Sequence, residues 1–123
     1  MSPRLSSSHL LDRLNALAAV GAIEGGGCAR LALTDEDKAG RDLVVGWMKA
    51  LGLAVTIDAM GNVTGLRGGR EKLAPVMTGS HIDTVRTGGR YDGNYGVLAG
   101  LEVVRALNDA RLTGWAPSYV IFS

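Results

Sequence analysis

Apolar residues recur at the spacing of an amphipathic helix in three stretches of the chain. These stretches are residues 10–18, 43–51 and 97–107. Serines at 6–8 precede the first stretch, and a serine side chain is a good N-terminal cap for a helix. The pattern therefore predicts three helices, the first of which begins near these serines.

The middle helix has the clearest boundaries. Thr34 followed by Asp37 resembles a capping box, in which Asp37 replaces the more usual glutamate. Gly52 can end the helix because glycine readily adopts the left-handed conformation of a C-terminal cap. Trp47 and Met48 lie on the apolar side of this helix, which predicts that both side chains pack in the core.

Shorter apolar segments predict the strands of a sheet. Residues 53–58 alternate between larger and smaller or polar side chains, and a turn at 60–62 predicts a hairpin that returns through 63–64. Residues 75–80 begin with consecutive apolar positions, which predicts a strand in the interior of the sheet. Residues 118–122 predict a further buried strand.

Strands separated by long helices favour an α/β fold with helices packed on the faces of the sheet. The length of 123 residues allows one compact domain. A chain that ends in a buried strand at 118–122 is expected to be part of a longer domain. We therefore expect residues 1–123 alone to be poorly soluble or partly unfolded, with an unpaired edge along the last strand.

Composition and charge exclude several classes of function. The chain has 13 Lys and Arg against 12 Asp and Glu, so it lacks the basic excess that nucleic acid or an anionic membrane would require. No segment resembles a secretion signal or a membrane span. Cys28 is the only cysteine, which predicts a reducing, cytoplasmic location and a role as a small apolar core residue.

Candidate chemistry is concentrated in a polar, glycine-rich loop between the strand at 75–80 and the helix at 97–107. Ligands of α/β proteins commonly bind at such a position. His81 and Asp92 are suitable ligands for a divalent metal, and a carboxylate can bridge two ions. Asp83 could accept a hydrogen bond from the other imidazole nitrogen and so fix the tautomer of His81.

Glycines in this loop would let the backbone turn tightly enough to bring Asp92 back to His81. They are Gly88, Gly89, Gly93 and Gly96. Spacing alone leaves two interpretations open, because a histidine near a strand end is commonly a hydrogen-bonded structural residue and not a metal ligand.

Two other motifs are incompatible with the same loop. A dinucleotide-binding fingerprint requires GxGxxG at the start of the helix, and the glycines between 93 and 100 have other spacings. A calcium loop that started at Asp92 would require glycine and glutamate where the chain has Val97 and Val103.

Serine chemistry is also disfavoured. Ser80 lies beside His81, but no GxSxG elbow surrounds it, so we expect Ser80 to be structural. His9 has no acidic or cysteine neighbour at ligand spacing, which predicts an exposed surface residue.

Three segments around the loop carry a resemblance to a known family. They are residues 79–85 (GSHIDTV), 88–98 (GGRYDGNYGVL) and 99–107 (AGLEVVRAL), with weaker agreement at 30–37 and 58–62. In these segments the chain resembles the two-metal amidohydrolases that include N-carbamoyl-L-amino-acid hydrolase, allantoate amidohydrolase and β-ureidopropionase. These enzymes are related to aminoacylases and dinuclear zinc exopeptidases.

The resemblance implies a role for each acidic or histidine residue of the loop. His81 would bind one metal, Asp92 would bridge two metals, and Asp83 would assist catalysis by orienting His81. The implied cofactors are two divalent ions, with zinc as the first expectation and manganese, cobalt or nickel as alternatives. In the family, the general base, a further acidic ligand and two more histidine ligands follow the position of Ser123.

The resemblance also implies a fold and an assembly. We expect residues 1–123 to form a partial metallo-amidohydrolase domain, the N-terminal part of a three-layer αβα zinc-exopeptidase-like catalytic domain. The second half of the sheet and an inserted dimerisation domain would lie outside it, and the full-length family is homodimeric.

The implied reaction is hydrolysis of a linear amide or ureido C–N bond in a small molecule. N-carbamoyl-L-amino acids are the expected substrates, with allantoate or ureidoglycolate as alternatives. A catalytic zinc site needs about three protein ligands and an open position, so we expect the isolated chain to be inactive. A non-catalytic remnant of a disrupted gene is the competing hypothesis.

Overall fold

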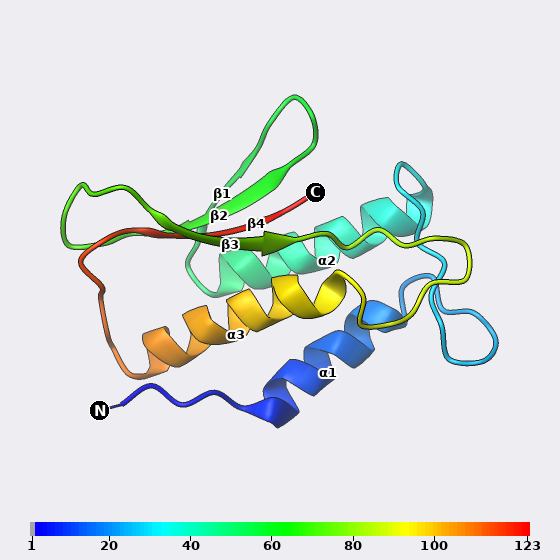
Figure 1. Cartoon of the computed structure of the whole chain (residues 1–123), viewed down its shortest axis with the longest axis horizontal. Helices are drawn as coiled ribbons and strands as arrows, with labels where there is room; N and C mark the ends of the chain where they lie inside the picture. The colour runs from blue at the N-terminus through cyan, green and yellow to red at the C-terminus, as the bar shows by residue number, and fades with distance from the viewer. Residues whose placement is uncertain (1) are drawn as a thin grey trace.

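The computed structural model describes residues 2–123, which form three helices and a four-stranded sheet (Figure 1). The helices are α1 (Ser7–Ala18), α2 (Asp35–Ala50) and α3 (Asn94–Asp109). The strands are β1 (Ala54–Ile57), β2 (Val63–Arg67), β3 (Val76–Ser80) and β4 (Ser118–Phe122). The predicted elements are therefore all present, in the predicted α/β class.

The helix caps confirm the predicted starts of α1 and α2. The Ser6 hydroxyl accepts a hydrogen bond from the His9 backbone N–H at 3.2 Å. The Thr34 hydroxyl accepts one from the Asp37 N–H at 3.2 Å, but the Asp37 carboxylate accepts from Leu33 N–H and not from Thr34. The reciprocal bond of a capping box is thus displaced by one residue, which extends the cap into the preceding loop.

The sheet has the order β1-β2-β4-β3. Strands β1, β2 and β4 pair antiparallel, whereas β3 and β4 pair parallel and are connected through α3. A parallel pair requires such a crossover, because the chain must return to the same end of the sheet. The crossover puts the loop between β3 and α3 at the carboxyl end of β3.

Two predictions about strand position are wrong. The sequence predicts an unpaired edge along β4, but this strand lies between β2 and β3 and pairs with both. The apolar start of β3 predicts an interior position, but β3 is an edge strand, with Val76 67% and Met77 56% exposed. Apolar composition indicates that a strand can be buried, but it does not determine which strands become its neighbours.

The core lies between the sheet and the helices, which occupy one side of it in Figure 1. It includes Leu14 and Leu17 of α1, Val44 and Met48 of α2, Leu98 and Leu101 of α3, and Val63, Val120 and Phe122 of the sheet. On the opposite face of the sheet, Tyr119 and Ile121 are only partly buried. Residues 2–123 therefore provide one helical side of the predicted three-layer arrangement. In this part of the chain, no helix is long and apolar enough to cross a membrane.

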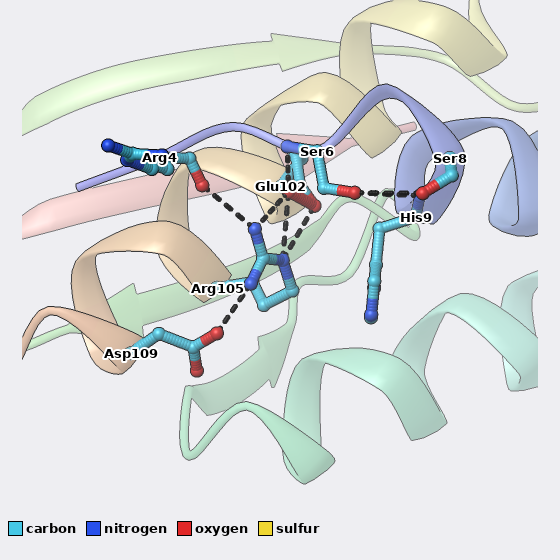
Figure 2. Close-up of polar contacts among 7 residues, drawn as sticks. All are labelled: Arg4, Ser6, Ser8, His9, Glu102, Arg105 and Asp109. Atoms are coloured by element: carbon cyan, nitrogen blue, oxygen red, sulfur yellow. Dashed lines mark hydrogen bonds and ion pairs between the residues drawn. The ribbon is translucent and has the colours of Figure 1, made fainter.

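A polar cluster joins the segment before α1 to α3 (Figure 2). Glu102 is only 3% exposed, and its carboxylate accepts hydrogen bonds from the Ser6 backbone N–H at 2.9 Å and from Arg105 Nε at 2.8 Å. Arg105 also donates to the backbone oxygen of Arg4 at 3.0 Å and pairs with Asp109. These contacts fix the N-terminal segment against the helix that follows the candidate loop.

The Glu102 carboxyl should make the stability of the fold depend on pH. Hydrogen bonds from Arg105 hold the pKa of Glu102 below its usual value, and they outweigh burial, which acts in the opposite direction. A carboxyl with a lower pKa in the folded state stabilises the fold above its unfolded pKa, about 4.3. This stabilisation is lost as the pH falls through the folded pKa.

We therefore expect Glu102→Gln to lower the free energy of unfolding at neutral pH by about 1–3 kcal/mol, since a charged acceptor of several hydrogen bonds is lost. The difference from the native chain should shrink below about pH 4. Urea unfolding across this range measures both effects. Asp109→Asn is the control, because this partner of Arg105 is largely exposed and should contribute only about 0–1 kcal/mol. A Glu102→Gln difference that stayed constant into acid would contradict the assigned cause.

Candidate functional site

The loop between β3 and α3 brings His81, Asp83 and Asp92 together, as the sequence predicted. His81 immediately follows β3, and Asp92 lies just before the N-terminal cap of α3. The three side chains line one open pocket together with Thr87 and Gly89. The pocket lies at the carboxyl end of a parallel strand, where α/β folds commonly place ligands.

The imidazole of His81 is held through its Nδ1 atom. Nδ1 lies 2.9 Å from the backbone oxygen of Asp83 and 3.2 Å from its carboxylate Oδ1. A carbonyl oxygen can only accept, so this geometry assigns the proton to Nδ1. Nε2 of the neutral ring then carries the free lone pair, which is the arrangement that a metal-binding histidine requires.

The free nitrogen faces the second predicted ligand. Nε2 of His81 lies 3.6 Å from Oδ2 of Asp92, whose side chain is 86% exposed. Two ligand atoms that each lie about 2.1 Å from a tetrahedral ion are about 3.4 Å apart. The separation of these two atoms and their chemistry therefore fit a shared divalent ion.

A glycine turn makes this approach possible. Gly93 has φ 71° and ψ −53°, a conformation that other residues avoid. A Cβ atom at this position would lie 2.5 Å from both Cε1 and the backbone oxygen of His81. The backbone of Gly93 thus packs directly against the His81 ring, and the turn places Asp92 beside it.

The other three glycines of the loop differ in whether their surroundings leave space for a Cβ atom. A Cβ at Gly88 would lie 2.7 Å from Thr84 Cβ, and one at Gly96 would lie 2.8 Å from Ser80 Cβ. A Cβ at Gly89 would meet no atom within 4 Å. Close approach therefore explains Gly88, Gly93 and Gly96, whereas packing provides no reason for a glycine at 89.

Other residues that the sequence singled out are either packed in the core or exposed at the surface. Cys28 is completely buried, and its thiol lies 3.3 Å from the backbone oxygen of Val20, in accord with its predicted core role. His9 is exposed, as predicted. Met48 and Trp47 of α2 were both predicted to pack in the core of the domain. Met48 is buried, and Trp47 is partly buried beneath the Arg13 guanidinium.

The site has two direct candidate ligands, since Asp83 acts on the far nitrogen of His81. Within residues 2–123, no group of three or more histidine, cysteine or acidic side chains is arranged to hold a metal. Two buried residues, Arg30 and Asn94, support the loop although the sequence pattern assigns a role to neither of them. No charge pattern near either residue in the sequence indicates their contact, because they are 64 positions apart.

Comparison with known proteins identifies the class to which this fold and loop are related. No protein-family model matches the chain. The N-carbamoyl-L-amino-acid amidohydrolase of Pseudomonas sp. (strain NS671) is 43% identical over 109 residues, which are 88% of this chain and 26% of the relative. The allantoate amidohydrolase of Bacillus subtilis (strain 168) is 41% identical over 83% of this chain and 25% of the relative.

The structural comparison gives the same class. A hydantoinase/carbamoylase family amidase from Burkholderia ambifaria superposes with a TM-score of 0.96 and 46% identity, over 99% of this chain and 30% of that structure. The fold and sequence are thus similar to those of proteins named as N-carbamoyl-L-amino-acid amidohydrolase, allantoate amidohydrolase and hydantoinase/carbamoylase family amidase. The chain is homologous to the N-terminal part of the hydantoinase/carbamoylase family amidases, and it spans 25–30% of the length of the relatives described.

Proposed function

We propose that the chain provides one half of a divalent-metal centre in an amidohydrolase that cleaves linear amide or ureido C–N bonds. The observation that carries the proposal is the orientation of His81, whose Nε2 faces the Asp92 carboxylate at 3.6 Å while Asp83 holds Nδ1. The homology to N-carbamoyl-L-amino-acid and allantoate amidohydrolases supports the reaction class.

Each residue of the proposed centre has a separate task. His81 Nε2 and the Asp92 carboxylate would hold the metal, and the second oxygen of Asp92 is free to contact a second ion. Such ions, when bound, polarise a carbonyl group and make water a stronger nucleophile near neutral pH. The backbone oxygen of Asp83 accepts a hydrogen bond from Nδ1 of the neutral His81 ring, so that Nε2 of this tautomer presents its lone pair to a metal. Zinc is the proposed ion, with manganese, cobalt and nickel as alternatives.

N-carbamoyl-L-amino acids are the proposed substrates of the complete enzyme. The Pseudomonas relative is named for these compounds and the Bacillus relative for allantoate. Both substrates contain a ureido group, so the same chemistry at the carbonyl carbon could serve either. Hydrolysis rates with the two compounds would distinguish them.

Residues 1–123 alone should not catalyse the reaction. His81 and Asp92 supply two ligands, whereas a catalytic zinc needs about three from the protein. Purified chain with added zinc or manganese is therefore expected to release no ammonia from N-carbamoyl-L-amino acids or from allantoate. Measurable hydrolysis that disappears in His81→Ala would contradict this proposal of inactivity.

Metal binding tests the proposed centre itself. We expect the chain to bind Zn²⁺ or Co²⁺ weakly, and His81→Ala or Asp92→Ala to weaken binding by at least about tenfold. Asp83→Asn should have a smaller effect, because the Asp83 backbone oxygen still accepts from Nδ1. Isothermal titration calorimetry measures these affinities, with His9→Ala as the matched control because His9 is the other histidine of the chain. An affinity that falls in His9→Ala but not in His81→Ala would refute the proposed site.

A further inference from the structure

Arg30 is a fully buried arginine in the segment between α1 and α2, with 0% of its surface exposed. Arginine is almost never buried to this extent unless it is paired. Among residues 2–123, however, no carboxylate lies within ion-pair distance of its guanidinium. Burial lowers the pKa of Arg30, against the attraction of Cys28, Asp37 and Asp83. Neutral hydrogen-bond acceptors must therefore replace the water that the charge has lost.

The guanidinium donates to several distant segments. Its Nη1 donates to the backbone oxygens of Leu17 at 2.9 Å and Val20 at 2.7 Å, at the end of α1. Its Nε donates to the backbone oxygen of Ile82 at 2.8 Å. Ile82 lies between His81 and Asp83, so this bond fixes the peptide that joins the candidate ligand to its orienting residue.

The remaining nitrogen reaches the other half of the candidate site. Nη2 of Arg30 donates to Oδ1 of Asn94 at 3.0 Å, and Asn94 is also completely buried. The side-chain amide nitrogen of Asn94 donates to the Arg90 backbone oxygen at 3.2 Å, and the backbone N–H of Asn94 donates to the Asp92 backbone oxygen at 2.8 Å. Asn94 thus connects the guanidinium to the turn that carries Asp92.

The backbone of Arg30 is attached to the same loop. The Arg30 N–H donates to the Thr84 hydroxyl at 2.7 Å, and the Thr84 N–H donates to the Arg30 oxygen at 2.7 Å. Gly40 of α2 leaves room for the side chain of Arg30, because a Cβ at Gly40 would lie 2.7 Å from Arg30 Cδ. Arg30 is therefore held rigidly from both ends while it contacts both sides of the site.

We propose that Arg30 is a positioning residue, which sets the distance between His81 and Asp92 by binding Ile82 on one side and Asn94 on the other. Its importance for metal binding rests on the proposed function, but its effect on geometry does not. Lysine cannot replace it, because one ammonium group lacks the planar array of donors that reaches diverging acceptors.

Nuclear magnetic resonance can measure this geometry directly. Because a Cβ on Gly93 would lie 2.5 Å from His81 Cε1, the α-proton of Gly93 in that direction lies against the ring. The nuclear Overhauser effect between this proton and His81 Hε1 reports the approach of the two halves. We expect Arg30→Met and Arg30→Lys to reduce its intensity by at least half, and Co²⁺ affinity to fall by at least about tenfold.

Val104→Ala controls for a general loss of stability, since Val104 is a buried core residue of α3 outside the loop. Each variant is compared with the native chain at a temperature at which both are folded. Val104→Ala should retain the native Overhauser intensity and the native Co²⁺ affinity. If Arg30→Met does not fold, Asn94→Ser tests the positioning role instead, because it breaks the contact between Arg30 and the Asp92 turn and leaves the contact between Arg30 and Ile82 intact.

A full Overhauser effect in a folded Arg30 variant, or in Asn94→Ser, would overturn the proposal. Absence of Co²⁺ binding by the native chain would instead refute the proposed metal centre, and the Overhauser comparison would still test Arg30.

Discussion

Gly93→Ala is expected to separate the two candidate ligands and to destabilise the loop. The methyl group would lie 2.5 Å from the His81 ring and from its backbone oxygen, far inside contact distance. The backbone at φ 71° and ψ −53° adds strain of about 1–3 kcal/mol for a residue with a Cβ. Because backbone atoms are involved on both sides, a change of side-chain rotamer cannot relieve the clash.

Thermal unfolding and Co²⁺ titration of the same sample measure both consequences of Gly93→Ala. We expect a clear loss of stability and a fall in affinity of at least about tenfold. Gly89→Ala is the matched control, because it changes a glycine of the same loop where a Cβ meets nothing within 4 Å. Its stability should stay within about 0.5 kcal/mol of the native chain. Equal behaviour of the two variants would contradict the role assigned to the Gly93 turn.

The second large effect on stability is expected in α2, where alanine substitution at two glycines should change the free energy of unfolding in opposite directions. Gly46 is exposed and open, so Gly46→Ala should stabilise the helix by about 0.5–1 kcal/mol. Gly40 is buried against Arg30, and a Cβ there would lie 2.7 Å from Arg30 Cδ. Gly40→Ala should therefore destabilise by about 1–3 kcal/mol in spite of the better helix propensity of alanine.

Urea unfolding of both glycine variants tests this opposite sign. The Arg30→Met background gives a further control, because a methionine side chain lacks the hydrogen bonds that anchor the guanidinium and can therefore turn away from a Cβ at position 40. Stabilisation by Gly40→Ala in the native background would mean that Arg30 can move aside easily, and the rigidity inferred for it would be wrong.

Local features of the chain were sufficient to predict its elements. Thr34 and Gly52 mark the limits of α2 because capping depends on neighbouring residues, and the predicted strand at 118–122 coincides with β4. The position of β3 could not be predicted in this way. Its apolar residues at 76 and 77 are compatible with either an edge or an interior position, and only the pairing of β4 with both neighbours decides between them.

In the candidate site, too, contacts between residues close in the sequence could be predicted, whereas contacts between distant residues could not. His81, Asp83 and Asp92 lie within one loop, so their approach to one another could be anticipated from a few glycines and the chemistry of the side chains. Arg30 could not be recognised, since its partners Ile82 and Asn94 are 52 and 64 positions away and neither carries a charge. Buried hydrogen bonds of this kind become visible only when the helices and the loop have been assembled.

Paramagnetic mapping is the most direct test of the proposed metal centre. Small additions of Mn²⁺ to ¹⁵N-labelled chain broaden the amide signals of residues close to the bound ion. The proposed centre predicts that the signals of His81, Asp83 and Gly93 broaden first, and that His81→Ala removes this selectivity. Broadening that begins around His9 or Glu102, or that remains unchanged in His81→Ala, would contradict a metal site at this loop.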